Sequence, residues 1–131
     1  MAQVLYLETQ QDFPHDATES CTAKLEYLFD HLKHFRVLTA TQVLPCGAAA
    51  VNQKISECWL VKNVVKNSFL EHYPGEPVMV TENNYRLQLF NGDQGIFLKF
   101  INPESREVEL KAVFVVDGVF KTFFQYELHH L

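Results

Sequence analysis

Amide, cationic and aromatic side chains occur close together between residues 83 and 99, and these residue types are suited to contacts with nucleic acid. Amide and cationic groups hydrogen-bond to phosphates and base edges. Aromatic rings stack on the bases of single strands. The candidates for nucleic-acid binding are Asn83, Asn84, Arg86, Asn91, Asp93, Phe97 and Lys99, with Tyr85 and Phe90 as further stacking rings.

The polar candidates also have structural explanations, and the sequence leaves both open. Asn91 precedes Gly92, a pair that favours a hairpin turn because both residues tolerate positive φ. Asp93 is expected to accept backbone N–H groups of its own loop. Arg86 and Lys99 suit either a contact with a nucleic-acid backbone or a solvated surface.

The aromatic candidates differ in their expected surroundings. Phe97 alternates out of phase with Ile96 and Leu98, so it faces the opposite side of its strand. Phe90 is expected in the core, and so is Trp59, which falls on an apolar helical stripe.

A second candidate site lies at Pro45-Cys46-Gly47, directly before a predicted helix. A helix N-terminus offers free N–H groups to an anion. Gly47 would then lie near the bound anion. Because the segment has one glycine and no lysine, a simple turn into the helix is the favoured explanation.

Several kinds of catalytic motif are absent from the sequence. It contains no phosphate-binding loop, no dinucleotide fingerprint and no nucleophile elbow. His31 and His34 are three residues apart, but nothing nearby completes a metal site. We therefore expect no metal or cofactor in this chain, and no complete enzyme.

Composition indicates ordinary globular material without a strongly basic face. The 131 residues are 47% hydrophobic and 21% charged, with a net charge of −5. That charge argues against a self-sufficient, tight nucleic-acid binder. Three cysteines at irregular spacing predict reduced thiols and a cytoplasmic protein. No apolar run is long enough to span a bilayer, so no membrane partner is expected.

The periodicity predicts an α+β chain with helices first. Leu25, Leu28 and Phe29 mark one face of a helix over 17–34. A strand is expected over 35–41 and a second helix over 48–60. From residue 76 the apolar residues recur with a period of two, which is typical of strands.

The second half is predicted to be a β-meander. Strands are expected over 77–81, 86–90, 95–101, 108–114 and 119–126, with turns at Asn91-Gly92 and Asp117-Gly118. In the strand over 108–114, apolar residues alternate with charged ones, so one face is expected to meet solvent. Short strands with tight turns suggest a small barrel.

The stretch from Gly75 to Ile96 closely resembles a signature of the RecD-type helicases, the alpha subunit of exodeoxyribonuclease V. Its distinctive residues are Gly75, Pro77, Val78 and Met79, followed by the run Leu89-Phe90-Asn91-Gly92-Asp93 and by Gly95. Upstream, residues 45–52 look like another segment of that family, which opens a helix of the second motor domain. The resemblance implies a nucleotide-proximal position just before this segment, where relatives often have arginine or lysine and this chain has Gln42. The resemblance covers about residue 35 to the end.

The resemblance implies two domains, a partial RecA-like segment over 1–75 and an antiparallel SH3-like β-barrel over 76–131. It also implies a 5′→3′ DNA helicase and hydrolase in recombination and repair, whose partners are single-stranded DNA and the other exodeoxyribonuclease V subunits. ATP and Mg²⁺ are implied for the parent protein, whose ATPase motifs are not found in this chain. The leading hypothesis is a non-catalytic piece that helps to handle single-stranded DNA. The alternative is an SH3-like module that docks other subunits.

Overall fold

The computed structural model describes residues 13–14, 19–34, 37–63, 72–102 and 104–128. The chain forms two compact units, Met1–His34 with His72–Leu131, and Phe35–Glu71. We call the first the sheet unit and the second the helical unit. The predicted domain boundary at residue 75 stays a prediction.

Helix α2, Glu19–His34, confirms the helix expected from the apolar spacing, and it ends at the predicted residue. Its apolar face is buried in one hydrophobic cluster with three residues of the sheet unit's third strand. The helical members are Cys21, Leu25, Leu28 and Phe29. Burial of this face stabilises the helix far more than local propensity does.

The sheet is an antiparallel meander. It consists of β2 (Pro77–Met79), β3 (Gln94–Ile101), β4 (Val108–Val116) and β5 (Val119–Phe124), each paired with the next. A two-residue strand, β1 (Phe13–Pro14), pairs in parallel with the end of β3. β1 and β2 therefore share one edge of β3, while β4 covers the other.

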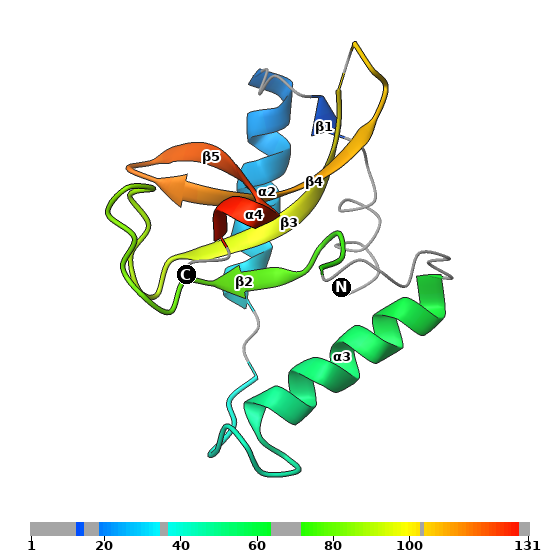
Figure 1. The fold of residues 1–131 in the computed structure, drawn as a ribbon, viewed down its shortest axis with the longest axis vertical. Coiled ribbons are helices and arrows are strands. Elements are labelled where there is room, and N and C mark those ends of the chain that lie inside the picture. Colours follow the sequence, from blue (N-terminus) through cyan, green and yellow to red (C-terminus); the bar gives the residue numbers. More distant parts are fainter. Residues whose placement is uncertain (1–12, 15–18, 35–36, 64–71, 103, 129–131) are drawn as a thin grey trace. The chain divides into compact units, whose positions relative to one another are not determined.

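Alternation along β3 places side chains in two separate cores. Ile96, Leu98 and Phe100 belong to the cluster with α2. Phe97 faces the opposite way, into a cluster with Val80 and Leu89. In Figure 1, α2 crosses one face of the sheet and the short helix α4 (Gln125–Leu128) lies on the other. The predicted phase of β3 is thus confirmed, and both faces are covered.

Strand β4 differs from its predicted half-exposed pattern. Lys111 is only 5% exposed, although its place in the alternation predicted a solvent-facing side chain. Its Nζ lies 2.7 Å from Oε2 of Glu109, and 4.5 Å and 5.7 Å from the ring centroids of Phe124 and Phe100. An ion pair and two aromatic faces replace the water that this ammonium would otherwise bind.

The strand predicted over 86–90 is absent from the meander, and the predicted end of the last strand is wrong. Residues 85–88 form a turn that is closed by an isolated bridge between Asn84 and Leu89, so no strand spans 86–90. The last strand ends at Phe124 rather than at Tyr126. There the Glu127 carboxylate accepts the Phe124 N–H at 2.7 Å and starts α4. The tight Asp117-Gly118 turn is confirmed, with both residues at positive φ.

The helical unit contains α3, Ala48–Asn63, which confirms the second predicted helix and its first residue. The strand expected over 35–41 is wrong for residues 37–41, which have no regular structure, and residues 35–36 lie outside the described part. A strand needs a neighbour for its N–H and C=O groups, and residues 37–63 provide none. Trp59 is half-buried rather than a core residue.

The α+β class and its antiparallel sheet are therefore confirmed. The sheet is open in the described part of the chain. The RecA-like and SH3-like assignments stay predictions. Among the described residues, no helix is long and apolar enough to cross a membrane.

Candidate nucleic-acid interface

The loop of residues 80–93 joins β2 to β3 and contains most of the candidate residues; we call it the β2–β3 loop. Its middle is closed by two backbone hydrogen bonds between Asn84 and Leu89, of 2.7 and 3.1 Å. Gln88 takes a positive φ of 58° to make this turn. Leu89 is completely buried, so the loop is anchored in the core of the sheet unit.

Side-chain oxygens hold the rest of this loop. The Oδ1 of Asn84 accepts the Leu87 N–H at 3.1 Å, and the Oδ1 of Asn83 accepts the Asn91 N–H at 2.8 Å. The Oδ2 of Asp93 accepts the Phe90 N–H at 2.7 Å. These bonds confirm the structural explanation for Asp93, and they show that both asparagines build the loop too.

Two aromatic rings stand exposed on this scaffold. Tyr85 is 75% exposed and Phe90 is 46% exposed, and their rings meet edge to face with centroids 6.0 Å apart. The expectation that Phe90 lies in the core is wrong, because its neighbour Leu89 takes the buried position. Side chains on adjacent residues of an extended segment point to opposite sides.

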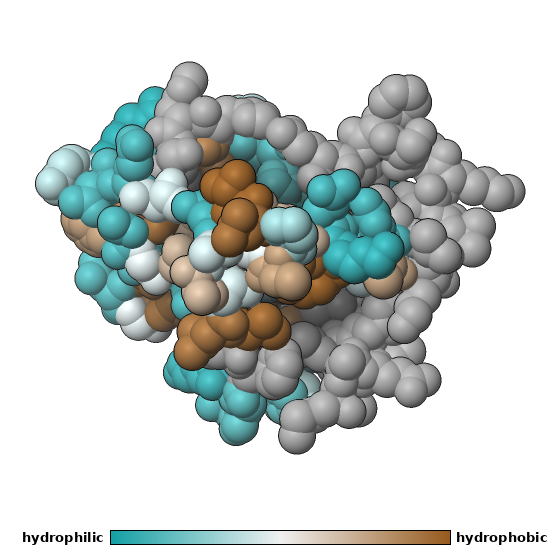
Figure 2. Space-filling view, turned by 90° about the horizontal axis from the view of Figure 1, so that it is seen from below, coloured by the Kyte–Doolittle hydropathy of each residue, from teal (hydrophilic) through white to brown (hydrophobic). Residues whose placement is uncertain are grey.

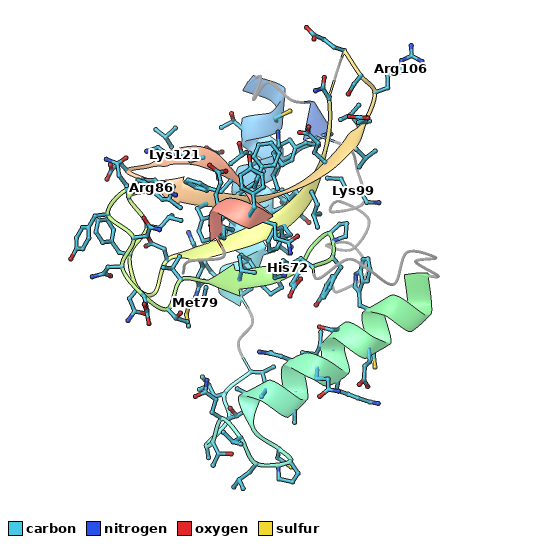
Figure 3. All side chains as sticks on the ribbon, viewed as in Figure 1. His72, Met79, Arg86, Lys99, Arg106 and Lys121 are labelled. Atoms are coloured by element: carbon cyan, nitrogen blue, oxygen red, sulfur yellow. The ribbon has the colours of Figure 1, made fainter. Side chains whose placement is uncertain are left out.

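Two cations belong to or contact the β2–β3 loop, and sequence reasoning found only one of them. Arg86 is exposed within the loop. Lys121 comes from β5, and its Nζ donates to Oε1 of Gln88 at 2.7 Å, which attaches the strand to the loop. Figure 3 shows Arg86 and Lys121 at the same end of the sheet. The missing signal was the register of β5, which no local pattern encodes.

The remaining candidates of the sheet unit lie elsewhere. Phe97 is 1% exposed and stacks on His72, with centroids 4.2 Å apart, so it belongs to the core and not to a binding surface. Lys99 is half-buried on β3 and lies toward the far end of the sheet from Arg86, as does Arg106. The structure thus brings together the candidates of the β2–β3 loop and separates Phe97 and Lys99 from them.

The helical unit places Gly47 and Gln42 side by side in the turn before α3. The N–H groups of Ala48 and Ala49 donate to the carbonyls of Thr41 and Gln42, at 3.0 and 3.2 Å. The Gly47 N–H donates to Leu44 at 2.6 Å. Because these first N–H groups are already bonded, the geometry favours a simple turn here over an anion site.

We expect Gly47→Ala to destabilise the helical unit by about 1–3 kcal/mol, the usual cost of forcing atoms into filled space. A Cβ at Gly47 would lie 2.7 Å from the carbonyl carbon of Gln42 and 2.9 Å from the carbonyl oxygen of Leu44. Denaturant unfolding followed by the fluorescence of Trp59, the single tryptophan, measures the change. The exposed neighbour provides the control, because Cys46→Ala should change stability by less than about 0.5 kcal/mol. Equal stability of the Gly47→Ala and Cys46→Ala variants would contradict this account of the turn.

No three histidine, cysteine or acidic side chains gather to hold a metal within the described ranges. His31 and His34 each place Nδ1 near the carbonyl oxygen one turn earlier on α2, at 3.1 and 2.8 Å. All three cysteines are free thiols; Cys21 is buried, and Cys46 and Cys58 are exposed.

Comparison with curated proteins finds relatives that share one name, RecBCD enzyme subunit RecD. The protein of Mycolicibacterium smegmatis is 34% identical over 70% of this chain. That of Mycobacterium tuberculosis H37Rv is 33% identical over 51%, and that of Buchnera aphidicola is 29% identical over 56%. The chain spans 12–15% of the length of these relatives.

No protein-family profile matches the chain, and no solved structure gives a significant match. The curated relatives confirm the resemblance to RecD-type helicases that the segment from Gly75 to Ile96 predicted.

Proposed function

We propose that this chain is part of a helicase subunit in an exodeoxyribonuclease V-type recombination and repair complex, where it helps to handle single-stranded DNA during unwinding. The observation that supports this proposal is the similarity to proteins named RecBCD enzyme subunit RecD. The work of translocation, with its ATP and Mg²⁺, belongs in this proposal to motor parts not found in this chain, which itself contributes no catalytic residue. A cytoplasmic location is part of the same proposal.

The structure gives the helicase-like signature a physical role that agrees with this proposal. Gly92 takes a φ of 97°, which other residues rarely adopt, and its N–H donates to the Val80 carbonyl at 2.9 Å. Asp93 closes the turn through the Phe90 N–H, and Leu89 anchors it. These signature residues therefore build the β2–β3 loop, whose exposed tip is left available for a ligand.

The test is binding of a fluorescently labelled oligodeoxythymidylate to the full 131-residue chain, measured by anisotropy. We expect weak binding that falls as salt rises. With contacts from Arg86 and Lys121 only, affinity should drop roughly fivefold to tenfold between 50 and 200 mM salt. No binding at low salt, and none when the chain is extended to both motor domains, would overturn the proposal.

A second candidate function is docking of the other subunits of the complex, and exposed apolar side chains favour it. Leu38 and Val43 of the helical unit are 92% and 90% exposed. Apolar side chains also reach the surface among hydrophilic ones in Figure 2. Co-purification with the other subunits that survives nuclease treatment and high salt, together with no binding of the oligonucleotide, would favour this function.

A further inference from the structure

We infer that Tyr85 and Phe90 form a stacking platform for the bases of a single-stranded nucleic acid, with Arg86 and Lys121 beside it for the phosphates. The inference rests on the proposed function and names the surface that performs it. It leaves out the candidates Phe97 and Lys99, and it adds Phe90, which was expected in the core, and Lys121, which was not a candidate. The occupant is a flexible, unpaired strand, because only unpaired bases expose their faces to a protein ring.

The two ends of the sheet differ in what they offer such a strand. The end formed by the β2–β3 loop has exposed aromatic rings together with cations. The turn between β3 and β4 contains the cation Arg106. In the sequence, Arg106 lies between the acids Glu104 and Glu107. The Asn102 side chain of the turn is bonded to the N–H groups of Glu104 and Ser105. The described residues 102 and 104–107 of this turn include no aromatic ring, so stacking favours the loop end.

Ring geometry at the loop end suits stacking. The planes of Tyr85 and Phe90 are 78° apart, so the edge of one ring points at the face of the other. Such a contact covers at most one face of one ring, which leaves the other faces free of this partner. Tyr85 is three-quarters exposed, so most of its side chain is accessible to a base.

The rings are held in place before any ligand arrives. The hydrogen bonds from Asn83, Asn84 and Asp93 bind the backbone at Leu87, Phe90 and Asn91. A loop that is already ordered loses little conformational entropy on binding. The polar side chains of Asn83, Asn84 and Asp93 are thus used within the loop, while the rings of Tyr85 and Phe90 remain exposed.

Charge distinguishes a nucleic acid from an apolar protein segment as the occupant. Arg86 is adjacent to Tyr85 in the chain, and Lys121 is attached to the same loop through Gln88. Asp93 uses its carboxylate within the loop. Glu82 is the remaining acid of the loop. The two cations can meet two phosphates, whereas a purely apolar partner would leave them unmatched.

Photocrosslinking of the full chain to an oligodeoxythymidylate that contains 5-iododeoxyuridine tests the inference directly, because this base forms covalent bonds with aromatic rings that lie against it. Mass spectrometry then identifies the crosslinked residues. We expect crosslinks at Tyr85 and Phe90. In parallel anisotropy measurements, Tyr85→Leu keeps an apolar side chain but removes the ring, and it should weaken binding roughly tenfold.

Matched variants at other exposed sites serve as controls. Tyr126 is an exposed tyrosine that already stacks on Phe124, so Tyr126→Leu should keep the original affinity. Arg86→Gln should weaken binding several-fold, while Arg106→Gln should leave it unchanged. Thermal unfolding at the same temperature as the original chain shows that the Tyr85 variant is folded.

The possible results separate the inference from the proposed function. Binding with crosslinks at other residues only, or unchanged affinity of the Tyr85→Leu variant, overturns the stacking platform and leaves DNA handling intact. Absence of both binding and crosslinks, in this chain and in the chain extended to both motor domains, overturns the proposed function and the platform with it.

Discussion

Replacing Phe97 with alanine is expected to lower the free energy of unfolding by about 3–5 kcal/mol, the range for removing a buried phenyl ring. Phe97 lies in the cluster that also contains Phe114 and Phe123, and it stacks on His72. The loss leaves a cavity between the sheet and the residues that cover it. Denaturant unfolding followed by far-ultraviolet circular dichroism measures the change.

The control for this variant is Phe90→Ala, which removes the same ring from an exposed site. It should lower the free energy of unfolding by less than about 1 kcal/mol, because Phe90 is 46% exposed and lies outside both buried clusters. A Phe97→Ala variant with unchanged stability would contradict the core position. If that variant also lost affinity for the oligonucleotide, Phe97 would act as a binding residue after all.

Replacing Lys111 with methionine is expected to lower the free energy of unfolding by about 2–3 kcal/mol. Removing one partner of a buried ion pair leaves the other charge without compensation, which costs about 3–5 kcal/mol when both are fully buried. The Glu109 side chain is 27% exposed, so water screens part of this penalty. The same denaturant experiment measures it.

A double-mutant cycle isolates the ion pair from the packing of the lysine stem. Lys111→Met combined with Glu109→Gln removes both charges and should recover about half or more of the loss, because no buried carboxylate remains uncompensated. Lys121→Met provides a control on the neighbouring strand, where the ammonium has a neutral partner. With the Glu109→Gln single variant completing the cycle, a loss in the double variant equal to the sum of the two single losses would show that the pair contributes no coupling energy.

The elements that the sequence predicted well are those in which one local period decides the structure. The spacing of Leu25, Leu28 and Phe29 is that of one helix face, and α2 follows it to His34. The Asp117-Gly118 turn is fixed by the ease with which these residues take positive φ. Such signals depend on a few adjacent residues and on no distant contact.

The failures occur where a distant or side-chain contact decides. Residues 86–90 alternate like a strand, but the asparagine at 84 and the bridge to Leu89 turn them back. Lys111 is buried because Glu109 and two rings supply what water would have supplied. Phe90 was expected in the core but is exposed, and Phe97 was a binding candidate but is buried. Both errors have the same origin, since the exposure of a side chain depends on which elements cover it.

The sequence predicted only those residues of the candidate site that are close together in the chain. The loop residues were identified because they are neighbours in the sequence. Lys121 is 33 residues away from its partner Gln88, and only the pairing of β5 with β4 brings them together. Lys99 has a suitable charge, but its register places it toward the other end of the sheet.

The arrangement of strands around β3 also limits pairing between the edge strands of two copies of this protein. An outer strand with open N–H and C=O groups is a template on which another chain can add a strand. One side of β3 is covered by two separate short segments, β1 and β2, so neither offers a long template. On the other side β5 is the outer strand of the described sheet. It is six residues long, has Lys121 near its middle and runs directly into α4. A short, charged and abruptly ended border of this kind disfavours strand-by-strand aggregation.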